Sequence, residues 1–265
     1  MQGTVCAVDG TRISYRRWGD HSAPNRLVLI HALAMDGGFW EPTARALSDT
    51  WQVIAVDCRG HGTSGKPAGP YSVELFADDA VAVLDHAGWG KTIVAGASMG
   101  GCVALAFAAR HPGRLGGLGL IDTTAWYGDD AVAAWEERGQ KAVEGGMAAL
   151  VGFQKSRWFS DAYRAAHPGA INAAITTFTA NDVVAYLETC RMLGRADLRA
   201  VLPSIAVPVQ VVVGEEDYAT PIATAEMLAT AIPGAELTVL PGVRHFTPLE
   251  VPALVAQRLE RLGDQ

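Results

Sequence analysis

A serine in a short glycine-rich segment has the setting of a catalytic nucleophile. Residues 96–100 read Gly-Ala-Ser-Met-Gly, and a further glycine follows them. An apolar stretch precedes the segment and an alanine-rich stretch follows it, so we expect a strand, a tight turn and a helix. Glycines permit such a turn because neighbouring backbones approach closely there. The pattern predicts Ser98 as a nucleophile at a helix N-terminus, where the helix dipole favours developing negative charge.

A serine hydroxyl becomes a good nucleophile only when a base accepts its proton. Among seven histidines, His245 lies between the last predicted strand and the final helix, which makes it the candidate base. A third group must orient the imidazole and stabilise its charged form. Asp217 follows the predicted strand at residues 209–213 and is the candidate acid. Asp122 follows the preceding strand and is the alternative.

Acyl transfer also requires hydrogen-bond donors for the oxyanion that forms in the transition state. The backbone N–H of Met99, directly after the nucleophile, is one predicted donor. The loop after the strand at residues 27–30 should supply the other, and by position we choose the N–H of Leu33. The Leu33 side chain would then form part of the pocket wall.

The elements that must position these groups follow from the hydrophobic pattern. An Asp-Gly turn joins two β-like stretches, residues 4–8 and 12–18, into a predicted hairpin. Continuous apolar runs predict strands covered on both faces: residues 27–30, 53–56, 92–95, 115–121, 209–213 and 237–240. Helical stretches lie between them: residues 40–47, 73–86, 99–110, 222–231 and 252–262. This alternation predicts an α/β fold with a mostly parallel eight-stranded sheet flanked by helices.

One long insertion interrupts the alternation after the sixth strand. Residues 123–203 predict a helical cap, and residues 1–122 and 204–265 form the predicted core. Its expected helices are residues 131–144, 146–153, 161–167, 170–177 and 183–194. Open α/β folds bind ligands at the carboxyl edge of the sheet, where we expect the cap to lie. We therefore predict Trp126, Trp135 and Trp158 as substrate-binding residues. For any one of them taken alone, a place in the hydrophobic core of the cap is the favoured alternative.

Composition excludes several classes of protein. A net charge of −7 argues against a nucleic-acid partner. No segment has the pattern of a targeting signal or the roughly 18 to 20 apolar residues of a membrane-spanning helix, so we expect a cytoplasmic protein without a membrane partner. The four cysteines lack pairing spacing and predict reduced thiols. Cys58 and His61 have no second ligand pair, so we expect no metal, and nothing in the sequence predicts a cofactor.

The order Ser98, Asp217, His245 resembles that of the α/β-hydrolase superfamily over the whole chain. Within it, the sequence is most similar to the 3-oxoadipate enol-lactonase group. Seven stretches carry that likeness: residues 33–40, 57–64, 70–73, 97–101, 157–159, 195–198 and 214–221. Two positions depart from the group, which usually has glycine at Ala34 and often alanine at Arg244. We expect residues 57–64 to be structural.

The resemblance implies a serine hydrolase that cleaves a small ester or lactone through an acyl-enzyme, with 3-oxoadipate enol-lactone as a candidate substrate. Such a substrate carries a carboxylate, and Arg157 is the predicted cation that binds it. The alternative for Arg157 is a surface ion pair within the cap. Other reactions remain open for the same triad, namely carbon–carbon bond hydrolysis and cofactor-free perhydrolysis, and a ligand receptor is a third alternative. A homo-oligomer is compatible with the sequence.

Overall fold

The computed structural model describes residues 1–263, which contain one eight-stranded sheet. The strands are β1 (Gln2–Cys6), β2 (Arg12–Trp18), β3 (Asn25–Ile30), β4 (Trp51–Asp57), β5 (Thr92–Ala97), β6 (Leu115–Ile121), β7 (Val209–Gly214) and β8 (Glu236–Leu240). Their order in the sheet is β1-β2-β4-β3-β5-β6-β7-β8. β2 is antiparallel to β1 and β4, whereas the remaining neighbours are parallel. The prediction of a mostly parallel sheet with an N-terminal hairpin is confirmed.

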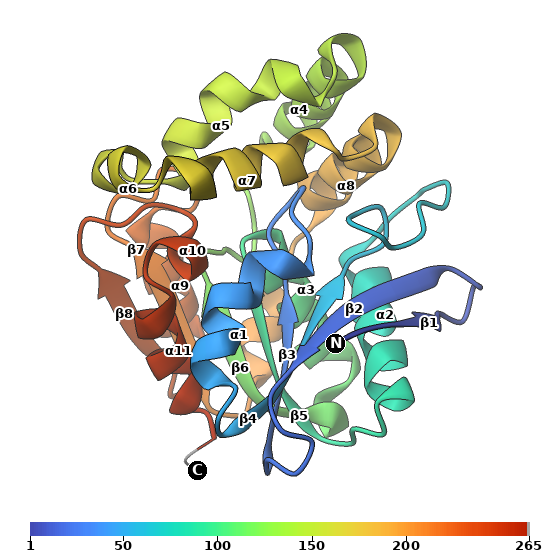
Figure 1. Ribbon diagram of the computed structural model, residues 1–265, viewed down its shortest axis with the longest axis vertical. Helices are drawn as coiled ribbons and strands as arrows, with labels where there is room; N and C mark the ends of the chain where they lie inside the picture. Colours follow the sequence, from blue (N-terminus) through green and yellow to red (C-terminus); the bar gives the residue numbers. More distant parts are fainter. Residues whose placement is uncertain (264–265) are drawn as a thin grey trace.

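Helices cover both faces of the sheet (Figure 1). They are α1 (Glu41–Leu47), α2 (Val73–His86), α3 (Met99–Arg110), α9 (Ile222–Ala231), α10 (Thr247–Glu250) and α11 (Pro252–Glu260). α1 packs against α11, and α2 packs against α3. Every residue of β4, β5 and β7 is buried, as expected of strands that are apolar on both sides. Because the strands from β3 to β8 run in parallel, their carboxyl ends meet at one edge.

Five helices between β6 and β7 lie above that edge (Figure 1). They are α4 (Ala131–Gly145), α5 (Val151–Trp158), α6 (Asp161–Ala166), α7 (Pro168–Thr179) and α8 (Val183–Arg195). The helix predicted at residues 146–153 requires correction. Gly146 ends α4 with φ 73°, a short 3-10 helix follows at Met147–Leu150, and α5 continues to Trp158. Arg157 therefore lies in the last turn of a helix.

Among residues 1–263, no helix is both long enough and apolar enough to cross a membrane.

Candidate active site

Ser98 occupies the sharp turn between β5 and α3. Its backbone has φ 52° and ψ −116°, and its N–H donates to the Ile121 carbonyl at 2.9 Å. A Cβ atom at Gly96 would lie 1.9 Å from the Gly100 carbonyl oxygen, and one at Gly100 would lie 2.1 Å from the Ile30 oxygen. Only glycine fits at these two positions, since real Cβ atoms do not approach so closely. The turn thus holds the serine in a strained conformation that lifts its side chain off the sheet edge.

The structure brings Ser98, His245 and Asp217 into one hydrogen-bonded chain. His245 lies in the loop after β8, and its Nε2 is 2.9 Å from the Ser98 Oγ. Its Nδ1 is 2.8 Å from the Asp217 Oδ2, in the loop after β7. Nδ1 must carry the proton for that contact to be a hydrogen bond, which leaves Nε2 free to accept the serine proton.

Asp217 is held in its ionised form by several donors. Its carboxylate accepts from the N–H of Ala219 at 2.7 Å and from the N–H and hydroxyl of Thr220 at 3.0 and 2.8 Å. Burial by itself raises the pKa of Asp217. The charge of His245 and the hydrogen bonds from His245 and Thr220 more than offset that effect, so the pKa lies below its ordinary value.

The alternative acid, Asp122, is fully buried and makes different contacts. It accepts from the N–H of Gly214 at 3.2 Å and from the N–H and hydroxyl of Thr247 at 3.1 and 2.7 Å. No hydrogen bond joins it to His245. Burial and the nearby charge of Asp217 raise the pKa of Asp122 well above its ordinary value. Asp122 therefore links the loops after β7 and β8, while Asp217 contacts the imidazole.

The two predicted oxyanion donors lie close to the nucleophile with their amides unoccupied. Among the described residues, neither the Leu33 N–H nor the Met99 N–H donates to another protein group. Leu33 belongs to a turn closed by the Met35 N–H and the Ala32 carbonyl, 3.0 Å apart. Ala34, in the same turn, has φ 60°, a conformation that costs a non-glycine residue about 1 kcal/mol. Glycine at this position would avoid that cost.

A cavity of about 100 Å³ adjoins Ser98 and His245 beneath the cap. Core loops contribute Ala32, Leu33, Ala219, Thr220 and Phe246 to its wall, and the cap segment contributes Tyr127, Trp135, Arg138, Gln154, Arg157 and Trp158. Three of the predicted substrate-binding residues, namely Trp135, Arg157 and Trp158, are thus placed at the cavity.

Trp126 requires correction, because the structure places it outside this cavity. Its backbone forms an isolated bridge with Asp197, and the Arg199 guanidinium lies 3.7 Å from the centre of its ring. The next residue, Tyr127, lines the cavity instead. Consecutive side chains of an extended segment point to opposite sides, so only one of the two can face the site.

The Tyr127 hydroxyl is a further polar group near the nucleophile that sequence analysis missed. Tyr127 lines the same cavity as Ser98, and its hydroxyl lies 3.8 Å from the Cys102 Sγ. Burial, followed by the effect of Cys102, raises the pKa of Tyr127 well above its ordinary value, so the phenol stays neutral. Its ring packs edge-on against Trp135, with 5.1 Å between the centroids.

Arg138 is the second residue that sequence analysis missed. Its Nε donates to the Tyr186 hydroxyl at 2.8 Å, and its guanidinium lies 4.7 Å from the centre of the Trp135 ring. Within residues 1–263 it forms no ion pair. A signal was available, since Arg138 lies three residues after Trp135 on one predicted helix and therefore shares its face.

Arg157 also lacks the ion pair that its alternative interpretation required. Across residues 1–263 it has no carboxylate partner. It donates instead to the Tyr218 carbonyl at 2.7 Å, and its guanidinium lies 4.7 Å from the centre of the Phe153 ring. Burial lowers the pKa of Arg157, and the charge of Arg138 lowers it further. Two cations of the cap therefore face one small cavity.

Gln154 adds an unused donor to the same wall. Its side chain is only 3% exposed, and its Nε2 has no hydrogen-bond partner in the structure. A buried amide without a partner is unfavourable by roughly 1–3 kcal/mol, which a bound acceptor would relieve. The cavity thus combines positive charge with a free donor, although the whole chain carries a net charge of −7.

Arg244, the cation next to the candidate base, does not line this cavity. Its Nη1 donates to the carbonyls of Ser156 and Phe159 at 2.8 and 3.1 Å and pairs with Asp161 at 2.9 Å. Its Nε lies 3.3 Å from the Glu216 carboxylate. Arg244 therefore connects the core to the cap.

Residues 57–64 contact neighbouring loops, in line with the structural role predicted for them. Asp57 accepts hydrogen bonds from the N–H groups of Gly37 and Thr63 at 2.8 and 2.9 Å. Arg59 forms a buried pair with Asp79 at 2.6 Å. These contacts brace the sheet edge behind the turn that holds Leu33.

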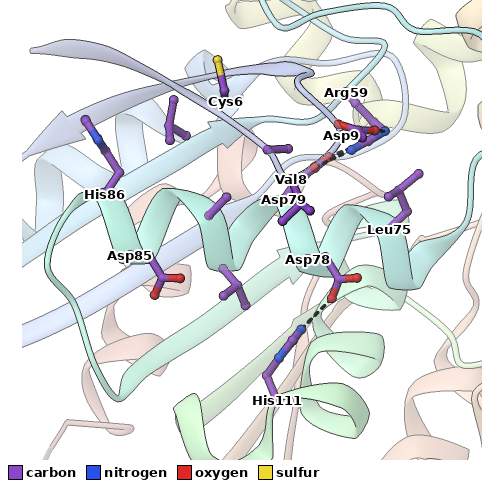
Figure 2. Close-up of a pocket in the computed structure, with 14 residues that line it drawn as sticks. Cys6, Val8, Asp9, Arg59, Leu75, Asp78, Asp79, Asp85, His86 and His111 are labelled. Atoms are coloured by element: carbon purple, nitrogen blue, oxygen red, sulfur yellow. Dashed lines mark hydrogen bonds and ion pairs between the residues drawn. The ribbon is translucent and has the colours of Figure 1, made fainter.

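A larger cavity of about 750 Å³ lies elsewhere, between β1 and α2 (Figure 2). Its carboxylates already have partners, since Asp79 pairs with Arg59 and Asp78 contacts His111 at 2.7 Å. In the part of the chain that the structure describes, no group of three or more His, Cys, Asp or Glu side chains could hold a metal ion. We therefore place the candidate active site at Ser98.

Comparison with known proteins identifies the family. A family model described as alpha/beta hydrolase fold matches residues 25–252, and the chain belongs to that family. It is 28% identical over 252 residues to 3-oxoadipate enol-lactonase 2 of Acinetobacter baylyi, an alignment that covers 95% of this chain and 92% of that protein. The solved enol-lactonase of Burkholderia xenovorans LB400 is 31% identical with a TM-score of 0.94, covering 99% of this chain and 100% of that chain. A 2-(acetamidomethylene)succinate hydrolase of Mesorhizobium japonicum is 26% identical over 247 residues, 90% of this chain and 87% of that protein. The predicted fold and the resemblance to enol-lactonases are confirmed.

Proposed function

We propose that this protein cleaves a small ester or lactone through an acyl-enzyme formed on Ser98. The proposal is carried by one observation, the hydrogen-bonded chain from Ser98 through His245 to Asp217 beside two unoccupied amides. His245 Nε2 accepts the serine proton as Oγ attacks the carbonyl carbon. Asp217 stabilises the imidazolium that results.

The tetrahedral intermediate places negative charge on the former carbonyl oxygen. The N–H groups of Leu33 and Met99 are the donors for this oxyanion, each worth about 3 kcal/mol in such sites. His245 then gives its proton to the leaving oxygen as the carbon–oxygen bond breaks. Water attacks the acyl-enzyme with His245 again as the base, and Ser98 is regenerated.

For the substrate we propose a lactone or ester that carries a carboxylate, with 3-oxoadipate enol-lactone as the specific candidate. Arg138 and Arg157 offer two cations that have no carboxylate partner among residues 1–263, and Gln154 offers a buried N–H that is free within the same range. Planar guanidinium groups match carboxylates in charge and geometry. The names of the relatives point the same way, because oxoadipate and succinate are both carboxylates. A cavity of about 100 Å³ favours a small acyl group.

The test is an assay of the purified protein on p-nitrophenyl esters, neutral lactones and 3-oxoadipate enol-lactone, with Ser98→Ala as control. We expect the enol-lactone to show a kcat/KM orders of magnitude above that of neutral lactones, and the variant to be inactive. Turnover of neutral esters alone would retain the triad but contradict the anionic substrate. Turnover only of a vinylogous diketone, or peroxide-dependent halide oxidation, would instead favour carbon–carbon hydrolysis or perhydrolysis.

A further inference from the structure

One side chain of the cap contacts the turn that carries the Leu33 amide. Asn181 lies between α7 and α8, and its Nδ2 donates to the Ala34 carbonyl at 2.8 Å. The same nitrogen lies 2.9 and 3.1 Å from the carbonyls of Thr177 and Phe178 in the last turn of α7. All three partners are carbonyl oxygens, so the nitrogen of the amide must face them. In Figure 1 the loop after β3 rises to the cap beside these two helices.

The contacted turn is held in an unfavourable conformation. Ala34 is fully buried and has φ 60°. A four-residue turn with positive φ at its third residue normally requires glycine or asparagine at that position. Rotation of the peptide plane between Leu33 and Ala34 would return Ala34 to negative φ, as in the commoner type I turn. Alanine is therefore less favourable than glycine at this position, and the turn depends on its contacts with neighbouring segments.

The Asn181 contact holds the carbonyl of Ala34, one residue beyond Leu33, and so fixes where the turn lies relative to the cap. The Leu33 N–H, the proposed oxyanion donor, belongs to the peptide unit that opens this turn, so a displacement of the whole turn displaces the N–H with it. We propose that Asn181 is a positioning residue that keeps the Leu33 amide directed at the oxyanion. The second donor, the Met99 N–H, is fixed by α3 and has no such dependence.

It follows that the seating of the cap controls one of the two oxyanion donors. Three other cap side chains join the core near the loops after β7 and β8: Arg157 with Tyr218, Ser160 with Glu250, and Tyr163 with Leu249. Arg195 of α8 donates to the Tyr71 carbonyl. Among the described residues, Asn181 is the only cap residue whose side chain hydrogen-bonds to the turn at residues 32–35. A substrate that shifts the junction of α7 and α8 would thereby alter catalysis as well as binding. This inference rests on the proposed function.

The test compares Asn181→Ala with the matched control Tyr163→Phe. Each removes one side-chain hydrogen bond from the cap to a core carbonyl, since the Tyr163 hydroxyl donates to the Leu249 carbonyl at 3.0 Å. The measurement is kcat and KM for a p-nitrophenyl ester and its thionoester. Sulfur accepts hydrogen bonds poorly, so the preference for the oxygen ester reports how well the oxyanion donors are placed.

We expect Asn181→Ala to lower kcat for the oxygen ester about 10- to 100-fold, below the 10²- to 10³-fold typical of losing a donor. KM should change little, and the preference for oxygen over sulfur should fall by a similar factor. Tyr163→Phe should leave the preference unchanged. Equal losses on both esters, or no difference from Tyr163→Phe, would overturn the inference.

A second variant separates positioning from general loss of structure. Asn181→Asp keeps the size of the side chain but replaces the N–H donor with an acceptor, so it should lower kcat and the preference for oxygen at least as much as Asn181→Ala. A preference for oxygen in Asn181→Asp equal to that of the wild type would contradict the positioning role. A wild-type protein inert toward both esters would overturn the proposed function instead. The role of Asn181 would then be tested by the rate at which a fluorophosphonate labels Ser98. The phosphoryl oxygen of that reagent should accept hydrogen bonds from the same two amides.

Discussion

The carboxyl edge of the sheet and the inner surface of the cap meet at the same cavity but differ in how their polar groups are satisfied. At the sheet edge, Ser98, His245 and Asp217 are joined end to end by hydrogen bonds of 2.9 and 2.8 Å. In the cap, Arg138 and Arg157 lack carboxylate partners among the described residues. The sheet edge therefore contains a complete proton-transfer chain, whereas the cap contains two positive charges without a negative partner among the described residues.

This difference indicates which part of the molecule sets the reaction and which sets the substrate. A preorganised chain needs no rearrangement when the transition state forms, so it serves any carbonyl that reaches it. Unmatched cations at a small cavity favour a ligand that supplies the missing negative charge. Changes at the sheet edge should therefore reduce all activity, and changes in the cap should reduce activity selectively.

The largest effect is expected for Ser98→Ala. Removing the nucleophile should lower kcat by about 10⁶-fold on every substrate, because the remaining groups cannot replace covalent catalysis. Steady-state kinetics and a circular dichroism spectrum would show whether activity is lost with the fold intact. A loss confined to anionic substrates would contradict the division between edge and cap.

The next effect distinguishes the two buried acids. Asp217→Asn should lower kcat by about 10⁴-fold, because the amide favours the wrong imidazole tautomer. Asp122→Asn should have a far smaller effect on kcat, since Asp122 has no hydrogen bond to His245. Kinetics of the two variants at one pH provide the comparison. Equal losses would mean that both carboxylates, and not Asp217 alone, support the charged form of His245.

The cap arginines should show a selective effect. Arg138→Met and Arg157→Met should each lower kcat/KM for the carboxylate-bearing lactone about 10- to 100-fold, the loss expected when one hydrogen bond to a charged group disappears. Turnover of neutral p-nitrophenyl esters should be nearly unchanged. If either variant lowers both activities equally, that arginine supports the cap and does not bind the carboxylate.

A pH prediction follows from the raised pKa of Asp122. Between the pKa of about 4 in the unfolded chain and the higher pKa in the folded protein, the folded protein binds more protons. The contribution of Asp122 to the free energy of unfolding is therefore greatest at acidic pH. It falls as pH rises between these two pKa values, by about 1.4 kcal/mol for each pH unit. Urea unfolding at pH 4.5 and 7.5 should show that Asp122→Asn removes this decline. The pKa of Asp217 is lowered, so its ionised form stabilises the folded protein. That contribution to the free energy of unfolding is lost as pH falls below about 4.

The smallest effect is expected for Trp126. Because its ring packs against Arg199 outside the cavity, Trp126→Leu should change kcat/KM by no more than about 2-fold. Trp135→Leu, at the cavity wall, should reduce kcat/KM more strongly on the same substrates. A larger effect from Trp126→Leu would show that the wall of the substrate cavity extends as far as Trp126.

Much of the sheet edge was predictable because its features are local. The glycines around Ser98, the apolar run before it and the helix after it lie within a few dozen residues of one another. Parallel strands must end at one edge, so the loops that carry Asp217 and His245 had to approach Ser98. The same reasoning could not separate Asp122 from Asp217 geometrically, because both follow neighbouring strands.

The cap was less predictable because its helices are oriented by packing. The sequence indicated helices there, but α5 begins at Val151 and carries Arg157 in its last turn. The direction of Trp126 and Tyr127 depends on the pairing with Asp197, a residue 71 positions beyond Trp126 in the chain. The exposure of Arg138 to the cavity depends likewise on how α4 packs against α8.

The sequence by itself determined the class of chemistry, since the residue types, their order and the turn around Ser98 are written in consecutive residues. Only the tertiary structure decided which acid contacts His245, which aromatic side chain reaches the cavity, that Arg138 lines the cavity, and that Asn181 contacts the turn of Ala34. These choices arise from contacts between residues far apart in the chain. Such contacts leave no periodic pattern, because they depend on the relative orientation of whole helices and strands.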